Sequence, residues 1–270
     1  MDVTVVVLAY DQLDYTRNLL DSLRQSGIPD PSVVVVNNGS TDGTGEFLAG
    51  RPELRVVTLM PNQGFGSGWN AGARASTATW TVLFNNDVLV APGWLEGLLS
   101  FAKEHRLGIV SPAMREGALD YDLPAYADQF VHTMAPVKRL GVAHGVCIMI
   151  HRRVFDSIGV LVEDSRLGGY EDDEFFRRAR RAGIRMGITG RAFIHHFRSV
   201  TQDSIKARLK SNASLGDRDY YRKKYGLTWF VRRKEQARER LQFLVWRLHE
   251  RGRYGRTLRE KRTGGVSHYG

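Results

Sequence analysis

The chain contains 270 residues, of which 42% are hydrophobic and 10% aromatic, and it carries a formal net charge of +10. This apolar content is enough to bury a core and excludes a wholly disordered protein, while the length fits one large domain with an appendage or two small domains. The one cysteine, Cys147, can form neither an intramolecular disulfide nor a thiolate zinc cluster, so a reducing, cytoplasmic environment fits best.

The excess positive charge lies in the last quarter of the chain. Residues 1–200 contain 20 basic and 22 acidic side chains, whereas residues 201–270 contain 19 basic and 7 acidic ones. The two parts therefore carry net charges of −2 and +12. This change of composition predicts a balanced body, residues 1–205, and a basic helical C-terminal extension, residues 206–270.

The N-terminal residues begin with a short apolar run, from Val3 to Tyr10, with no basic segment before it and no small-residue cleavage site after it. We therefore predict a strand here and not a signal peptide. No segment approaches the ~18 uninterrupted apolar residues of a membrane span, so we expect any membrane contact to be peripheral.

Strands and helices alternate along the first third of the chain. Two β-branched runs, Val3–Leu8 and Val33–Val36, have the composition of strands buried on both faces of a parallel sheet. The segment Asp14–Arg24 has leucines on one face and ends before Gly27 and Pro29, which predicts the connecting helix. The alternation continues with a strand, a helix and a strand at Arg55–Leu59, Trp69–Ala75 and Thr81–Phe84. The predicted fold class is α/β, with a mixed, mostly parallel sheet flanked by helices.

Polar and glycine residues follow the predicted strands, at the edge of the sheet where α/β proteins bind ligands. The run Asn37–Thr44 has more polar residues than a turn and a helix N-cap need, so we favour a binding function over a structural one. The glycines of Asn62–Gly72 permit a close backbone approach to a ligand, and a helix N-terminus there could face a diphosphate. A dinucleotide fingerprint would instead follow the first strand, where Ala9–Gln12 contains no glycine.

The fourth predicted strand ends in Asn85, Asn86 and Asp87. A carboxylate at a strand end can hold Mg²⁺ or Mn²⁺, which usually sit on one or two carboxylates and on phosphate oxygens of the substrate. The alternative for Asp87 is a solvated aspartate in a turn, and this cluster alone does not decide between the two.

Six motifs in a fixed order resemble the inverting nucleotide-sugar glycosyltransferases of family 2, which have the GT-A fold. The resemblance covers roughly residues 1–205. The first three motifs are the strand and polar loop at 33–44, the glycine-containing segment at 62–72 and a variant of the metal-binding Asp-x-Asp at 84–87. The other three are a strand and loop at 145–159, an acidic helix start at 169–175 and a late His-x-x-Ser-x-Thr within 195–201.

This resemblance implies a rhamnosyltransferase-like enzyme with a donor half, residues 1–105, and an acceptor half, residues 106–205. It implies a UDP- or dTDP-sugar donor, a saccharide or lipid-linked acceptor, and Mn²⁺ or Mg²⁺ as the cofactor. The residues that it assigns to donor binding are Ala9, Tyr10, Asp11, Asn37, Asn38, Ser40, Asp42, Asn62, Gly64, Phe65, Gly68, Asn70, Asn86 and Asp87. Those that it assigns to acceptor binding are Gly145, Glu171 and Asp173, and its metal ligands are Asp87 and His196.

Two positions depart from the family's pattern. Asn37 stands where the family often has an acid that is implicated in reading the uracil or thymine ring. Asn85 replaces the first aspartate of Asp-x-Asp, which leaves Asp87 as the sole carboxylate of that motif, a variant found among rhamnosyl-type relatives. His196 fits the spacing of the late motif, whereas His195 would point to the opposite side of an extended chain, and the choice between the two stays open.

The chemistry of transfer gives these residues their expected roles. A divalent ion that bridges the two phosphates would stabilise the negative charge of the leaving group. The acceptor hydroxyl must lose its proton as it attacks, and the resemblance makes Asp172 the general base, with inversion at the anomeric carbon. The alternative for its neighbours Glu171, Asp173 and Glu174 is a solvated acidic helix start. Crowded like charges would raise the pKa of one of these carboxyls, which suits a base that works near neutrality.

The segment Arg106–Leu140 shows no sustained period and contains three prolines. We expect an irregular loop or lid on the acceptor side, because a stretch of this length without structure is unusual in a compact domain. Its aromatic side chains could stack on a sugar or base, or pack against the sheet.

In the basic extension, apolar residues recur at helical spacing from Val231 to Arg251, which predicts a basic amphipathic helix. Three functions compete for this helix: packing onto the body or a second subunit, attachment to an anionic membrane at its cytoplasmic face, and contact with nucleic acid. The last function would make the chain a nucleic-acid-binding protein or a glycosyltransferase that acts on modified DNA. A nucleic-acid-binding module without catalytic activity would not need the Asn62 loop, Asp87 and Asp172 in this order along the chain.

Overall fold

The structure is a computed structural model, and it describes residues 2–164, 167, 169–197, 218–226, 228–263 and 266–269. The strands of the described residues join in one sheet. They are β1 (Val3–Ala9), β2 (Val33–Asn38), β3 (Arg55–Leu59), β4 (Trp80–Asn85), β5 (Val88–Val90), β6 (Ile109–Gly117), β7 (Lys138–Leu140), β8 (Cys147–His151), β9 (Met186–His196), β10 (Arg259–Thr263) and β11 (Val266–Tyr269).

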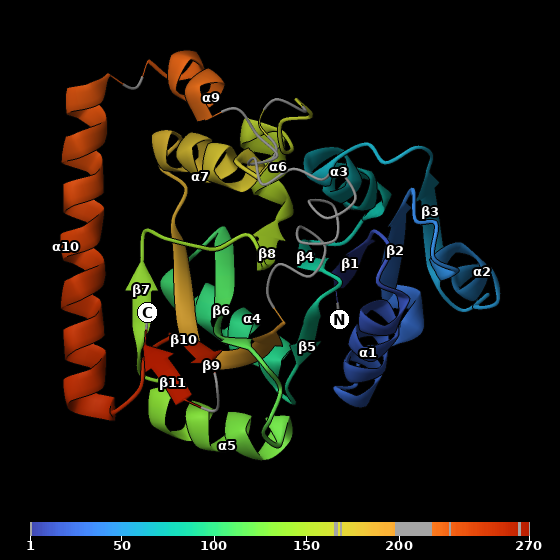
Figure 1. The fold of residues 1–270 in the computed structure, drawn as a ribbon, viewed down its shortest axis with the longest axis horizontal. Helices are drawn as coiled ribbons and strands as arrows, with labels where there is room; N and C mark the ends of the chain where they lie inside the picture. Colours follow the sequence, from blue (N-terminus) through green and yellow to red (C-terminus); the bar gives the residue numbers. More distant parts are fainter. Residues whose placement is uncertain are drawn as a thin grey trace.

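Helices lie on both faces of this sheet and along one edge of the molecule (Figure 1). They are α1 (Leu13–Gln25), α2 (Thr44–Ala49), α3 (Phe65–Ala75), α4 (Trp94–His105), α5 (Leu123–Met134), α6 (Arg152–Ile158), α7 (Glu171–Arg181), α9 (Arg218–Lys224) and α10 (Trp229–Tyr254). The predicted α/β class is therefore confirmed.

The sheet has the strand order β11-β10-β6-β8-β4-β1-β2-β3, and β9 pairs with β5, β6 and β7. Its N-terminal half is parallel, because β1 lies between β4 and β2, and β2 pairs with β3 in the same direction. Every residue of β1 and β2 is buried, which explains why these strands are continuous apolar runs without alternation.

Two apolar layers enclose the parallel part of the sheet. On one face, α1 and α4 contribute side chains such as Leu19, Leu23 and Trp94 to the core. On the other face, Trp69 of α3 and Phe175 of α7 pack against the strands. Because both faces are covered, the loops at the carboxyl ends of the strands are the part of this half that is left for binding.

The expectation of an irregular loop or lid at 106–140 is wrong, because this segment forms β6, α5 and β7. Strand β6 pairs with β8, β9 and β10 and is buried on both faces, so it has no alternation to detect. Its proline, Pro112, lies where the β6–β9 register shifts, and Pro124 lies in the first turn of α5, where a missing N–H costs no helical bond. Phe130 of α5 is fully buried, so this aromatic side chain packs against the sheet.

The basic extension contains the predicted helix, α10, but it is not only helical. After α10 the chain returns to the sheet as β10, which runs parallel to β6, and β11 pairs with β10. The sequence of β10 is strongly charged and gives no strand signal, yet Glu260 is buried and pairs with Arg115 of β6 at 2.8 Å. None of the described helices, α10 included, is both long enough and apolar enough to cross a membrane.

Candidate active site

The loops that follow β1 and β2 hold each other in place. The Asp11 carboxylate accepts a hydrogen bond of 2.7 Å from the Thr41 backbone N–H, and the Asp11 N–H donates to the Ser40 hydroxyl at 2.9 Å. Asp11 and Gln12 both have left-handed backbone angles, with φ of 52° and 61°. These hydrogen bonds between Asp11 and the Ser40–Thr41 turn fix the positions of the two loops that contain many of the predicted donor-binding residues.

The asparagines at the end of β2 fix the next loop. The side-chain oxygen of Asn38 accepts from the Gln63 N–H at 2.9 Å, and its amide donates to the Gly64 carbonyl at 3.0 Å. Asn62 accepts from the Gly64 N–H at 2.7 Å, and Asn37 accepts from the Ser40 N–H at 3.1 Å. Both β2 asparagines are buried; Asn38 shapes the loop between β3 and α3, and Asn37 shapes the loop directly after β2.

Asp42 connects two helices. Its carboxylate accepts from the Thr44 hydroxyl at 2.6 Å and from the Thr44 N–H at 3.2 Å, at the start of α2. It also accepts from the Leu13 N–H, the first residue of α1, at 2.9 Å. In this structure the Asp42 carboxylate stabilises both helix starts.

The glycines of α3 bring the helix close to its own sheet. A Cβ atom at Gly72 would lie 2.1 Å from the Val6 Cγ1 atom, and one at Gly68 would lie 2.4 Å from the Leu8 Cδ1 atom. At both positions the missing side chain lets α3 pack closely against β1. Gly64 differs: its φ is 85°, and a Cβ there would meet open space at the N-terminus of α3.

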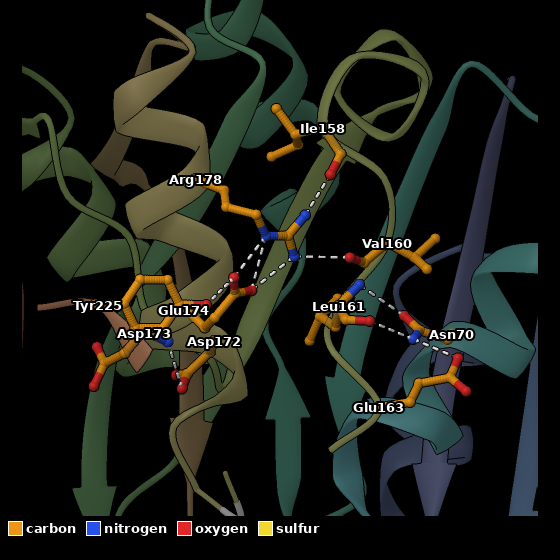
Figure 2. A network of polar contacts seen from close by, with 10 residues as sticks. All are labelled: Asn70, Ile158, Val160, Leu161, Glu163, Asp172, Asp173, Glu174, Arg178 and Tyr225. Atoms are coloured by element: carbon orange, nitrogen blue, oxygen red, sulfur yellow. Dashed lines mark hydrogen bonds and ion pairs between the residues drawn. The ribbon is translucent and has the colours of Figure 1, made fainter. Parts of the chain in front are cut away.

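The side-chain amides of Asn70 and Asn86, both predicted to bind the donor, form hydrogen bonds with other residues of the chain. Asn70 is fully buried, and its side chain bonds to the Leu161 N–H and carbonyl and to the Glu163 carboxylate, at 3.0, 2.8 and 2.8 Å (Figure 2). Asn86 is also buried and donates to the Asp11 carbonyl and the Thr16 hydroxyl. Phe65, at the start of α3, packs its ring against Trp69 at 4.3 Å between centroids.

Asp87 and His196 meet because β5 and β9 are antiparallel neighbours. Val88 lies opposite His196 in the register, and the Asp87 Oδ2 atom lies 3.4 Å from the His196 Nε2 atom. His195 points to the other face of β9, where its Nδ1 atom is 2.8 Å from the Tyr121 hydroxyl. Alternation along the strand thus separates the two histidines, and His196 is the one that faces Asp87.

Sequence reasoning missed a second carboxylate at this site, that of Glu116. The parallel register of β6 and β9 places Glu116 opposite His196, with 3.5 Å between its Oε1 atom and the Nδ1 atom of the ring. Arg259 of β10 contacts the same Oε1 atom at 2.9 Å. No motif surrounds Glu116 in the sequence, so only the register between the strands could have identified it.

The charges at this site shift two pKa values strongly. Burial lowers the pKa of His196, but hydrogen bonding and attraction from Asp87 and Glu116 outweigh it and raise this pKa to about 9. Burial raises the pKa of Glu116, but His196 and Arg259 outweigh it and lower this pKa to about 2. Near neutral pH His196 is therefore an imidazolium beside the side chains of Glu116 and Asp87, and a cation that binds the Nε2 atom must displace its proton.

Asp87 and His196 are suited to only part of a metal site. Two ligands at about 2.1 Å from one ion are about 3 to 3.4 Å apart, and the observed separation of 3.4 Å allows one cation to contact both. Within the described residues, no group of three His, Cys, Asp or Glu side chains is arranged to hold a metal. The pair fits a cation whose other ligands are substrate phosphate oxygens and water.

The carboxyl group of Asp172 lies against Gly145. A Cβ atom at Gly145 would be 2.1 Å from the Asp172 Oδ2 atom, so only glycine leaves room for this carboxyl group. Asp172 is half-buried in the first turn of α7, and its Oδ1 atom accepts from the Asp173 N–H at 2.9 Å. Burial, followed by the negative charges of Asp173 and Glu171, raises the pKa of Asp172 to about 7.

The other acids at the start of α7 are not a uniform solvated cluster. Glu171 is buried, its pKa is raised by burial, and it accepts from the Gly169 N–H at 2.7 Å. Glu174 is buried and binds Arg178, which also donates to the carbonyls of Ile158 and Val160 (Figure 2). Only Asp173 of the neighbours is exposed, so the alternative of a solvated helix start holds for that residue alone.

The elements that carry Asp172 and Asp87 reach the same end of the sheet. Gly145, which touches Asp172, is followed by Val146, whose carbonyl accepts from the Asn85 N–H at 3.3 Å. Asn85 is the last residue of β4, two positions before Asp87. The β4–β8 pair therefore joins the base candidate to the metal candidate at one edge of the sheet.

Comparisons with known proteins agree with this arrangement. Residues 4–159 match the family model described as "Glycosyl transferase family 2". A low-salt glycan biosynthesis hexosyltransferase, Agl10 of Haloferax volcanii, is 27% identical over 69% of this chain and 64% of its own length. An N-acetylglucosaminyl-diphospho-decaprenol L-rhamnosyltransferase of Mycobacterium tuberculosis is 26% identical over 71% of this chain and 75% of its own length.

Solved structures share the fold. S. aureus TarS 1–349, solved in complex with UDP, matches 72% of this chain and 60% of its own chain with a TM-score of 0.57 at 20% identity. GalNAc-T7, solved with UDP, GalNAc and Mn²⁺, also gives 0.57, at 14% identity over 72% of this chain and 43% of its own. The expected GT-A arrangement is thus confirmed, although the chain spans less than two thirds of Agl10 and of both solved proteins. The family model covers more than half of the chain, and the chain belongs to glycosyl transferase family 2.

Proposed function

We propose that this chain is an inverting glycosyltransferase that moves a sugar from a nucleoside diphosphate to an acceptor hydroxyl. The observation that carries this proposal is the position of the Asp172 carboxyl group, packed on Gly145 at the end of the β4–β8 pair from which Asp87 follows. A carboxyl group with a pKa near 7 and a carboxylate suited to a cation, at one sheet edge, are the two groups that such a transfer needs.

Asp172 would act as the general base. Its raised pKa matches a group that accepts a proton near neutral pH, because a base is most effective when its pKa is close to the working pH. The close packing of the Oδ2 atom on Gly145 and the hydrogen bond from the Asp173 N–H to the Oδ1 atom support a carboxyl group that is positioned before the acceptor binds. Direct attack by the deprotonated hydroxyl would invert the anomeric centre.

Asp87 and His196 would hold Mn²⁺ or Mg²⁺ together with phosphate oxygens of the donor. The ion would neutralise the charge that develops on the departing diphosphate. Glu116, on the far side of the His196 ring, would hold the imidazole with its Nε2 atom toward Asp87.

The loops after β1, β2 and β3 would form the donor site. Support comes from the mutual bonds of Asp11, Ser40, Asn38 and Asn62, which preform this edge, and from the open space beside Gly64 at the N-terminus of α3. Two structural relatives were solved with UDP, which supports a UDP-sugar donor, and a dTDP-sugar is the alternative that the resemblance to the family leaves open. The acceptor would be a saccharide or a lipid-linked glycan at the cytoplasmic face of a membrane.

A panel of UDP- and dTDP-sugars tests this function on the purified full chain with Mn²⁺. A donor that binds only the folded state raises the free energy of unfolding by RT ln(1 + [L]/Kd), where [L] is the donor concentration, and so raises the melting temperature. We expect at least one donor to do so and to release its nucleoside diphosphate when saccharide or lipid-linked acceptors are added. Stabilisation by no member of the panel, with no release of UDP or dTDP, would contradict the proposal.

A further inference from the structure

The helix α10 contacts the rest of the described chain along one side, and most of its remaining surface is exposed. In Figure 1 the helix runs along the outer edge of the molecule, beside β7. Four apolar side chains on this surface are largely exposed: Phe230 at 78%, Leu241 at 62%, Val245 at 52% and Leu248 at 63%. With 3.6 residues per turn, these positions lie along one stripe, and exposed apolar stripes of this kind mark interaction surfaces.

Basic side chains border the stripe on both sides. Arg233, Arg240 and Arg247 are spaced by seven residues, so they form a column along one edge, and all three are exposed. Arg238 borders the other edge, and Lys234 lies among the apolar positions near that edge; both side chains are exposed. The apolar stripe is therefore framed by positive charge.

The acidic residues of α10 lie on the side of the helix opposite the stripe, where Glu235 and Glu250 contact the body of the protein and Glu239 is exposed. Glu250 is buried and contacts Arg139 of β7 at 2.8 Å. Glu235 contacts Arg177 of α7 at 3.1 Å, and Glu239 follows it by one helical turn. These ion pairs fix the rotation of α10, so its outer face combines apolar and basic side chains without acidic ones.

We propose that the outer face of α10 docks onto the surface of an anionic lipid bilayer. A helix that lies in the membrane interface buries its apolar stripe at the boundary of headgroups and acyl chains, while flanking Lys and Arg side chains reach the anionic headgroups. Trp229 at the start of α10 is 53% exposed, and tryptophan is well suited to this interface because its ring is apolar with one polar atom.

Charge and apolarity together favour a lipid surface over two other partners. In a dimer formed through this face, the basic columns of the two copies would border one interface and repel each other. On duplex DNA, the basic side chains would find phosphates, but the stripe of Phe230, Leu241 and Leu248 would bury nothing apolar. An anionic bilayer is the surface that satisfies both parts of the face.

This proposal rests on the surface of α10 and not on the proposed transferase activity. A chain without transferase activity would still bind vesicles, and an active enzyme could fail to do so. If both hold, docking would place the active site next to acceptors that are carried by the membrane lipid.

Cosedimentation of the full chain with vesicles tests the proposal. We expect binding to an equimolar mixture of phosphatidylcholine and phosphatidylglycerol, weakened by salt, and little binding to phosphatidylcholine alone. The triple variant Arg233→Gln, Arg240→Gln, Arg247→Gln should lose roughly a hundredfold in affinity. The double variant Leu241→Ser, Leu248→Ser should lose at least about tenfold, because two large apolar groups no longer enter the bilayer.

A matched control removes three exposed arginines from the opposite side of the molecule, by Arg17→Gln, Arg24→Gln and Arg55→Gln in α1 and β3 (Figure 1). This control should bind vesicles within about threefold of wild type, since those charges do not face the bilayer. Circular dichroism and the melting temperature check that each variant is folded.

The proposal is overturned if wild type does not prefer anionic vesicles, or if the leucine variant binds them as wild type does. It is equally overturned if light scattering shows a dimer that the leucine variant breaks while vesicles are not bound.

Discussion

Glu116 of β6 lies opposite His196 of the neighbouring strand β9, with its Oε1 atom 3.5 Å from the Nδ1 atom of the imidazole. His196 thereby has a carboxylate on each ring nitrogen, since Asp87 is 3.4 Å from the Nε2 atom. In metal sites, a carboxylate on the outer nitrogen fixes the orientation of a ligating histidine. The position of Glu116 predicts that role.

The substitution Glu116→Gln should weaken Mn²⁺ binding by about 10- to 100-fold, because the imidazole loses its orienting charge. Mn²⁺ titration by calorimetry measures this on the purified chain with UDP present. Arg259→Gln is the matched variant, since it removes the ion pair to Glu116 and leaves the carboxylate beside His196. It should have a smaller effect, and equal Mn²⁺ affinity of wild type and Glu116→Gln would contradict the role of Glu116.

The Asp172 carboxyl group should make folding stability depend on pH. Its pKa is about 7 in the folded chain, above the ordinary value of 3.8, so between these values the folded state binds the extra proton. Well above pH 7 the folded chain carries the unfavourable Asp172 carboxylate, which lowers its stability. This destabilisation disappears as the pH falls from 7 toward 4 and the carboxyl group becomes protonated. Asp172→Asn should therefore raise the melting temperature at pH 8 by a few degrees and have little effect near pH 4. A variant less stable than wild type at pH 8 would mean that the carboxylate is stabilised in the fold.

The substitution Gly145→Ala should slow transfer while the chain stays folded. The added Cβ would lie 2.1 Å from the Asp172 Oδ2 atom, so the carboxyl group must move. A displacement of about 1 Å costs roughly a hundredfold in rate. Gly252→Ala in α10 is the control, because a Cβ there meets nothing within 4 Å. In an Asp172→Asn background, Gly145→Ala should have no further effect on rate, and an additive loss would place its effect elsewhere.

The buried pair of Arg139 and Glu250 should anchor α10. Their side chains are 1% and 2% exposed and meet at 2.8 Å, and Glu250 also accepts from the Leu258 N–H. Glu250→Ala removes the carboxylate that accepts two hydrogen bonds from this buried guanidinium and should lower the free energy of unfolding by about 3 to 5 kcal/mol. Urea denaturation measures this, with the exposed Glu239→Ala on the same helix as the control, expected within about 0.5 kcal/mol of wild type. A change in Glu250→Ala no larger than in the control would show that the pair contributes little.

The parallel half of the fold could be predicted because its signals are local. The runs of β1 and β2 and the leucines of α1 are visible within short windows, and the motif at 62–72 marks the start of α3. The helix itself begins at Phe65 and not near Trp69, since Gly64 with its φ of 85° precedes the first turn.

The rest could not be predicted because it depends on strand pairing across long sequence distances. Strand β10 has the charged sequence REKRT and is held in the sheet by β6. Glu260 of β10 and its partner Arg115 of β6 are 145 residues apart in the sequence. Glu116 acquires its role from the β6–β9 register, which no local pattern specifies. In the same way, the amides of Asn70 and Asn86 fit a donor-binding motif in sequence, while the fold engages them with Leu161 and Thr16.

Whether Asp172 is the general base is tested by comparing wild type with Asp172→Asn in one assay, on the donor that the panel identifies. Donor Kd is measured by calorimetry, and transfer is measured as nucleoside diphosphate release in the presence of acceptor. Asp156→Asn, an exposed aspartate on α6, serves as the control for removing a carboxylate. For Asp172→Asn alone we expect a donor Kd within about threefold of wild type and a fall in kcat of at least about a hundredfold. Turnover by Asp172→Asn at the rate of wild type, with the same Kd, would remove Asp172 from the reaction and contradict the proposed mechanism.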